Sequence, residues 1–121
     1  MYITITAGHS NTDPGAVNGS DREADIAQDM RNIVASILRT DHGLEVKTDG
    51  EGKGNLPLRE AVKLIKGSRL AVEFHTNAAV NKTATGIEAL STPKNKAACQ
   101  RLCRAVEQAT GWKLRGEDGY K

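Results

Sequence analysis

The sequence predicts an α/β protein with a mostly parallel, twisted sheet flanked by helices. Short runs of β-branched and apolar residues alternate along the chain with stretches whose apolar residues recur every three or four positions. Residues 69–75 form a nearly continuous apolar run, which is typical of a strand at the centre of a sheet covered on both faces. A chain of 121 residues has the length of one domain, and we expect residues 1–121 to form a single domain.

The first half of the chain contains two predicted strands and one long helix. Ile and Thr alternate over residues 2–7, a β-rich pattern. Residues 20–23, Ser-Asp-Arg-Glu, have the form of a capping box and open a helix that Gly43 ends. A short strand over 44–48 and a polar, glycine-rich loop over 49–55 follow. We expect the inward face of this helix to carry Ile26, Met30, Ile33, Val34, Ile37 and Leu38.

The second half continues the alternation. A helix is predicted over 57–66, because proline is tolerated in a first turn and a glycine follows the last apolar position. The apolar strand 69–75, a further strand over 85–91 and a third helix from residue 92 to Gly111 complete the order. The expected inward residues are Leu58, Ala61, Val62 and Ile65 in the second helix, and Ala98, Leu102, Ala105, Val106 and Ala109 in the third.

Composition excludes several kinds of partner. The net charge is only +2, the basic residues are scattered, and four aromatic residues are too few for a base-stacking platform, so we expect no nucleic-acid partner. No apolar run approaches the ~18 residues of a membrane span, and no secretory signal opens the chain, so we expect no membrane insertion and synthesis in the cytoplasm. Cys99 and Cys103 lie four residues apart on the third predicted helix, where small core residues are the simplest role. The sequence leaves the oligomeric state open.

Three metal-ligating residues lie at the ends of predicted elements. His9 comes just after the first strand, Glu23 opens the first helix, and His75 ends the apolar strand. Parallel sheets place ligands at the carboxyl ends of their strands, so His9 and His75 are expected at the same edge. Two imidazoles and one carboxylate leave the fourth position of a tetrahedral Zn²⁺ ion open for water, as in catalytic sites. The sequence therefore predicts a zinc site formed by His9, Glu23 and His75.

Each of these residues also has a simpler interpretation by itself. His9 would be a solvent-exposed turn histidine, Glu23 would close the capping box, and His75 would be a hydrogen-bonded core histidine. A shared position at one sheet edge favours the zinc site over three separate explanations. Glu73 shares a side of its strand with His75, and is either a carboxylate behind the metal site or, as the simpler choice, part of a partly buried ion pair. Glu88 is open to a structural or a functional role.

The motifs around these residues resemble the zinc-dependent N-acetylmuramoyl-L-alanine amidases of the type-3 class, found as bacterial cell-wall hydrolases and phage endolysins. That family has a Gly-His strand end, an Asp-Pro-Gly-Ala loop, a glutamate opening the first helix, a Leu-x-x-Arg segment, a His-Ala-Asn-Ala segment and a Gly-x-Glu strand. The matching segments here are 8–9, 13–16, Glu23, 56–59, 75–78 with Thr76 in place of alanine, and 86–88. The resemblance runs over essentially the whole chain.

The resemblance implies that His9, Glu23 and His75 hold zinc and that the substrate is peptidoglycan, cut between N-acetylmuramic acid and the L-alanine of the stem peptide. In the family a later strand with a catalytic glutamate and a closing helix follow, and no segment of this sequence matches them. The catalytic base is therefore unassigned, and we expect impaired hydrolysis by residues 1–121. The missing signal favours a phage endolysin, made in the host cytoplasm and acting on the wall after release. A zinc-retaining wall-binding module and another zinc amidohydrolase or peptidase remain alternatives.

Overall fold

The computed structural model describes residues 1–9, 15, 17–18, 21–52, 56, 58–76 and 86–121. Contacts divide the chain into two compact units, residues 1–78 and residues 79–121. The expectation that residues 1–121 form a single domain stays a prediction. Within the described ranges, no helix is both long and apolar enough to cross a membrane.

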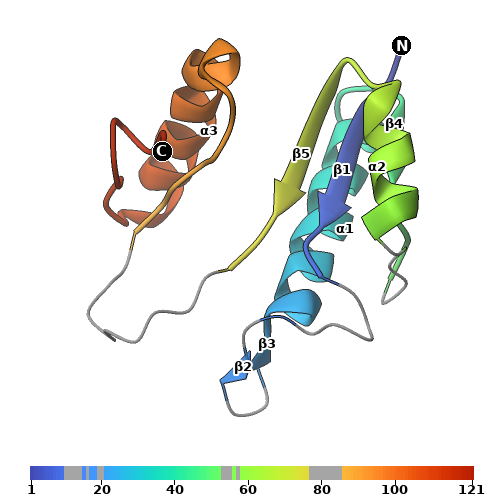
Figure 1. Ribbon diagram of the computed structural model, residues 1–121, viewed down its shortest axis with the longest axis horizontal. Coiled ribbons are helices and arrows are strands. Elements are labelled where there is room, and N and C mark those ends of the chain that lie inside the picture. The colour runs from blue at the N-terminus through green and yellow to red at the C-terminus, as the bar shows by residue number, and fades with distance from the viewer. Residues whose placement is uncertain (10–14, 16, 19–20, 53–55, 57, 77–85) are drawn as a thin grey trace. The chain divides into compact units, whose positions relative to one another are not determined.

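The first unit is built on a three-stranded parallel sheet (Figure 1). Strand β1 (Ile3–Ala7) lies between β4 (Val46–Thr48) and β5 (Leu70–Phe74), and both neighbours run parallel to it. Helix α1 (Glu23–Thr40) lies between β1 and β4 in the chain, and α2 (Leu58–Lys66) lies between β4 and β5. Parallel neighbours require such crossovers. The prediction of an α/β fold with a mostly parallel sheet is confirmed.

Strand β1, rather than β5, is the central strand of the described sheet. Its Ile5 packs with Ala35 of α1, while on the other face the Thr4 hydroxyl donates a hydrogen bond to the Leu64 carbonyl of α2 at 3.3 Å. The two helices therefore cover opposite faces. Alternating Ile and Thr suit this position, because a threonine can be buried when its hydroxyl has a partner. Within the described sheet β5 lies at an edge and every one of its residues is at least partly exposed, so the described residues do not place the run 69–75 at the centre.

Helix α1 packs on the sheet through small and polar residues. The predicted inward stripe is wrong in large part. Val34 and Leu38 are its only members that pack against the core. Alanines at the contact allow a close approach of the helix to the strands. The buried residues of α1 are Glu23, Ala24, Ala27, Gln28, Arg31 and Ala35, and its exposed large apolar residues are Ile26, Met30, Ile33 and Ile37.

Helices α2 and α3 (Lys96–Thr110) differ from their predicted stripes in the same way. In α2 only Ala61 is buried, and in α3 only Cys99 and Cys103 are. The exposed members of the two predicted stripes include Leu58, Val62, Ile65, Leu102 and Val106. The prediction that both cysteines are small core residues is confirmed, and both thiols are free.

The second unit places α3 beside a segment formed by the end of the chain. A short 3-10 helix, η1 (Pro93–Asn95), precedes α3, and Gly111 ends it with a positive φ of 76°. The described part of the predicted strand 85–91 forms isolated parallel bridges, Ile87 with Leu114 and Ala89 with Tyr120, instead of a continuous strand. In the first unit, a short antiparallel pair that the sequence did not predict, β2 (Val17–Asn18) and β3 (Asp21–Arg22), leads into α1.

Candidate metal centre

The site forms where β1 and β5 end. The register pairs Ala7, the last residue of β1, with Phe74, the last residue of β5, and the Gly8 amide donates a hydrogen bond to the Phe74 carbonyl at 2.8 Å. His9 and His75 therefore leave the sheet at the same edge, as predicted. Their rings meet edge to face, with centroids 5.3 Å apart and an interplanar angle of 89°.

Glu23 lies between the two imidazoles. Its Oε1 is 3.2 Å from His9 Nε2, and its Oε2 is 2.8 Å from His75 Nδ1. The backbone amide of Thr76 donates a further hydrogen bond to Oε2 at 3.1 Å. The capping-box interpretation is wrong: Glu23 is the first residue of α1, and the N-cap residue Arg22 makes no side-chain cap hydrogen bond. At this first position the partial positive charge of the helix N-terminus favours the ionised carboxylate.

The three side chains fit a zinc ion. One donor atom from each of His9, Glu23 and His75 lies within 4.8 Å of the other two. Donors bound at about 2.0–2.2 Å around a tetrahedral zinc are roughly 3.3–3.5 Å apart. The two imidazole nitrogens lie 3.2 Å and 2.8 Å from different oxygens of Glu23, so both are within ligand-to-ligand reach of the carboxylate. Imidazole nitrogen and carboxylate oxygen are both common zinc ligands, so the donor chemistry of the convergent group fits zinc.

Two glycines make room for the imidazole rings. A Cβ on Gly8 would lie 2.3 Å from Cε1 of His75, and a Cβ on Gly15 would lie 2.5 Å from Cδ2 of His9. Gly15 has a φ of 71°, and His9 itself has a φ of 65°, which is uncommon for a residue with a side chain. Strained backbone of this kind concentrates at functional sites. The ring of His75 covers Gly8, which explains why a glycine precedes His9 at the end of β1.

His75 has a second carboxylate partner. Its Nε2 is 2.9 Å from Oε2 of Glu73, and the Thr6 hydroxyl donates a hydrogen bond to Glu73 Oε1 at 3.1 Å. Burial alone would lower the pKa of His75. In the metal-free protein the hydrogen bonds and charges of Glu73 and Glu23 outweigh burial and hold the pKa of His75 above its usual 6.5.

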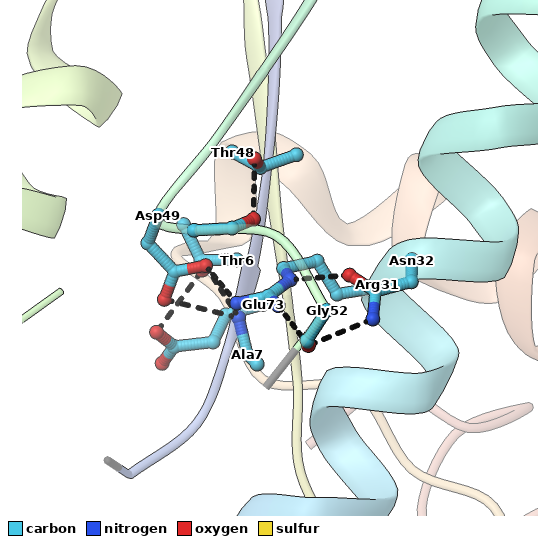
Figure 2. Close-up of polar contacts among 9 residues, drawn as sticks. Thr6, Ala7, Arg31, Asn32, Thr48, Asp49, Gly52 and Glu73 are labelled. Carbon is cyan, nitrogen blue, oxygen red and sulfur yellow. Dashed lines mark hydrogen bonds and ion pairs between the residues drawn. The ribbon is translucent and has the colours of Figure 1, made fainter. Parts of the chain in front are cut away.

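A polar network that the sequence analysis did not identify lies beside these residues (Figure 2). Asp49, directly after β4, accepts the Ala7 amide at 3.3 Å to each carboxylate oxygen. Arg31 Nη1 is 3.1 Å from Asp49 Oδ1, and Arg31 Nη2 donates to the Gly52 carbonyl at 2.9 Å. Burial raises the pKa of Asp49, although the hydrogen bonds from Arg31 and Ala7 oppose the shift. The network ties the end of β1, two residues before His9, to α1 and to the turn after β4.

One signal for this network was present in the sequence. Asp49 follows its strand just as His9 and His75 follow theirs, yet the surrounding glycines predicted a solvated loop. Arg31 gave no such signal, because a charged residue in a helix is usually solvated. Among the other candidates, Glu88 belongs to the second unit, where its Oε2 is 3.4 Å from both Arg115 Nη1 and Lys121 Nζ.

Comparison with known proteins identifies the class. The chain belongs to the Amidase_3 family of N-acetylmuramoyl-L-alanine amidases, whose family model matches residues 3–120. This confirms the resemblance that the motifs predicted. No curated protein gives a significant match.

Three solved structures are similar to the chain. A Neisseria meningitidis protein assigned to the N-acetylmuramoyl-L-alanine amidases is 80% identical, with a TM-score of 0.92, over 99% of this chain and 66% of that one. The catalytic domain of CwlV, an amidase from Bacillus (Paenibacillus) polymyxa var. colistinus, is 25% identical, with a TM-score of 0.77, over 96% of this chain and 68% of that one. The amidase AmiC2 of Nostoc punctiforme shares the fold at 22% identity and a TM-score of 0.83, over 95% of this chain and 67% of that one. The chain thus spans about two thirds of the length of each of these proteins.

Proposed function

We propose that the chain is a zinc-dependent amidase that hydrolyses the amide between N-acetylmuramic acid and the L-alanine of the peptidoglycan stem peptide. Family membership supports the amidase class and the peptidoglycan substrate. The observation that carries the zinc dependence is the convergence of His9 Nε2, His75 Nδ1 and the Glu23 carboxylate at one edge of the sheet. Bound there, zinc would supply the Lewis-acid chemistry that activates a water molecule and polarises the scissile carbonyl.

The residues of the chain have distinct parts in this proposal. His9 and His75 would donate through neutral imidazoles, and Glu23 would neutralise one of the two charges of the ion. The base that takes the proton from the water is not assigned. Glu73 is a poor candidate, because its two oxygens already have the Thr6 hydroxyl and His75 as partners. The endolysin role, release from the cytoplasm and impaired hydrolysis stay predictions.

Zinc content tests the metal site. Elemental analysis of the metal-replete protein should give one zinc ion per chain, and His9→Ala, Glu23→Ala and His75→Ala should each lose it. His42→Ala is a matched control, because His42 lies exposed beyond the end of α1 and outside the convergent group. Wild-type protein without zinc, or ligand variants that keep it, would reject the site.

Product analysis tests the reaction. Zinc-loaded protein incubated with purified peptidoglycan should expose new L-alanine amino groups and leave the glycan strands uncut, at the low rate that the expected impairment implies. Binding to peptidoglycan without new amino groups would favour the wall-binding module. New amino groups on a different stem-peptide residue would favour another zinc peptidase.

A further inference from the structure

Glu73 occupies an unusual place in the first unit. It is the one charged residue of β5, between Val72 and Phe74, which both pack against the core. The register places it directly beside Thr6 of the central strand. Its side chain is 36% exposed, yet both carboxylate oxygens have protein partners: the Thr6 hydroxyl lies 3.1 Å from Oε1 and His75 Nε2 lies 2.9 Å from Oε2. Figure 2 shows the contact with Thr6.

The two nitrogens of His75 face different carboxylates. Nδ1 lies 2.8 Å from Glu23, within the convergent group, whereas Nε2 lies 2.9 Å from Glu73, away from it. A neutral imidazole carries one proton, and the nitrogen that carries it cannot bind a metal. Which nitrogen faces the ion therefore depends on which carboxylate accepts the proton.

We propose that Glu73 is a positioning residue for the metal centre. It accepts the proton on His75 Nε2 and so selects the tautomer in which Nδ1 is free to bind the ion beside Glu23 and His9. The Thr6 hydroxyl holds the other oxygen of Glu73, which fixes the direction of the carboxylate. Histidine ligands generally donate their second ring N–H in this manner, and the partner orients the ring. The inference rests on the proposed zinc site and adds a residue that does not touch the ion.

The remaining geometry agrees with this role. The His75 ring lies against Gly8, where a side chain would collide with Cε1, Nδ1 and Nε2. Gly8 thus limits the ring from one side, while Glu23 and Glu73 hold its two nitrogens. The position of the ring is therefore constrained before a metal ion arrives.

The test is a set of zinc affinities measured by competition with a chelator. Glu73→Ala should bind zinc about 10–100-fold more weakly than wild type, the usual effect of losing such a partner. Glu73→Gln should stay within a few-fold of wild type, because its amide oxygen can accept the same N–H. Glu60→Ala, which removes an equal charge from the half-exposed Glu60 of α2, should leave the affinity unchanged. The melting temperature of each metal-free variant verifies that the fold is intact.

A spectroscopic readout distinguishes positioning from a purely structural role. Long-range ¹H–¹⁵N correlation on the zinc-loaded protein should show the His75 proton on Nε2, and Thr6→Val should weaken zinc binding less than Glu73→Ala does. A proton on Nδ1, or Glu73→Gln as weak as Glu73→Ala, would overturn the tautomer assignment. Wild type that binds zinc no more tightly than Glu73→Ala would overturn this inference alone. Wild type that binds no zinc would overturn the proposed function as well.

Discussion

Arg31 and Asp49 form an ion pair at 3.1 Å in which the two side chains are 0% and 1% exposed. Each also bonds to backbone, Arg31 to Gly52 and Asp49 to Ala7, so the pair joins α1, β1 and the turn after β4 (Figure 2). Removing one partner of such a pair leaves the other charge buried without a counter-charge, which destabilises the fold.

Arg31→Met is therefore expected to lower the free energy of unfolding by about 3–5 kcal/mol. Denaturant unfolding of the wild type and the variant gives the difference. Lys63→Ala is the control, since Lys63 forms an exposed pair with Glu60 at 3.3 Å and exposed pairs contribute about 0–1 kcal/mol. An equal decrease in the free energy of unfolding in the two variants would show that the buried pair contributes no more to stability than the exposed pair.

Gly8→Ala is expected to displace the His75 ring, because the added Cβ would lie 2.3 Å from Cε1. The ring can swing away without unfolding the sheet, so we expect zinc binding to weaken about tenfold or more, as when an orienting partner is lost, with little change in melting temperature. Gly43→Ala separates backbone strain from this effect. Gly43 has a φ of 63° and open space around it, so alanine there should cost about 1–2 kcal/mol of stability while zinc binding stays constant.

The stability of the metal-free protein should depend on pH through His75. Its pKa is raised above 6.5 in the folded state, mainly by Glu73 and Glu23 against the effect of burial. A raised pKa means that the folded state binds the proton more tightly, so the stabilisation is complete below pH 6.5 and is lost as the pH rises through the folded pKa. The difference in unfolding free energy between wild type and His75→Gln should shrink over that window. An NMR titration of the His75 ring that gives a pKa of 6.5 or lower would contradict the expectation.

Cys103 should react slowly with a thiol reagent in the folded protein. Burial raises the pKa of its thiol, with smaller contributions from Cys99 and Glu88, and the thiolate is the reactive form. Gly119 lies against it so closely that a Cβ there would be 2.4 Å from the Cys103 Cβ. Both cysteines should become reactive on unfolding, so the reaction rate with and without denaturant is the measurement. Fast labelling of Cys103 under native conditions would show that the second unit opens readily.

The convergence of His9, Glu23 and His75 could be predicted because it follows from local patterns. His9 and His75 come at strand ends, and parallel pairing brings strand ends to one edge whatever the remaining packing is. Glu23 was predicted to lie near both histidines because it opens the helix that returns across the sheet. The family motifs strengthened the assignment, and the structure brings the three side chains together as predicted.

The helix faces could not be predicted in the same way. In α1 the alanines and the large apolar residues both recur with helical spacing, so two faces compete on sequence pattern alone. The burial of Arg31 decides between them, and it depends on Asp49, a partner far along the chain that no local window contains. Likewise, the apolar run of β5 suggested a central strand, whereas the buried threonines of β1 occupy the centre of the described sheet because Leu64 and Glu73 accept their hydroxyl protons.

The parallel pairing of β1 with β5 has a consequence for folding order. His9 and Glu23 lie early in the chain, but neither can meet His75 until β5 has docked, and α1, β4 and α2 all lie inside the loop that this docking closes. Non-local parallel pairing is slow to form. A metal ion bound at this edge would stabilise only chains in which β5 has already paired with β1, and it would therefore stabilise the first unit as a whole.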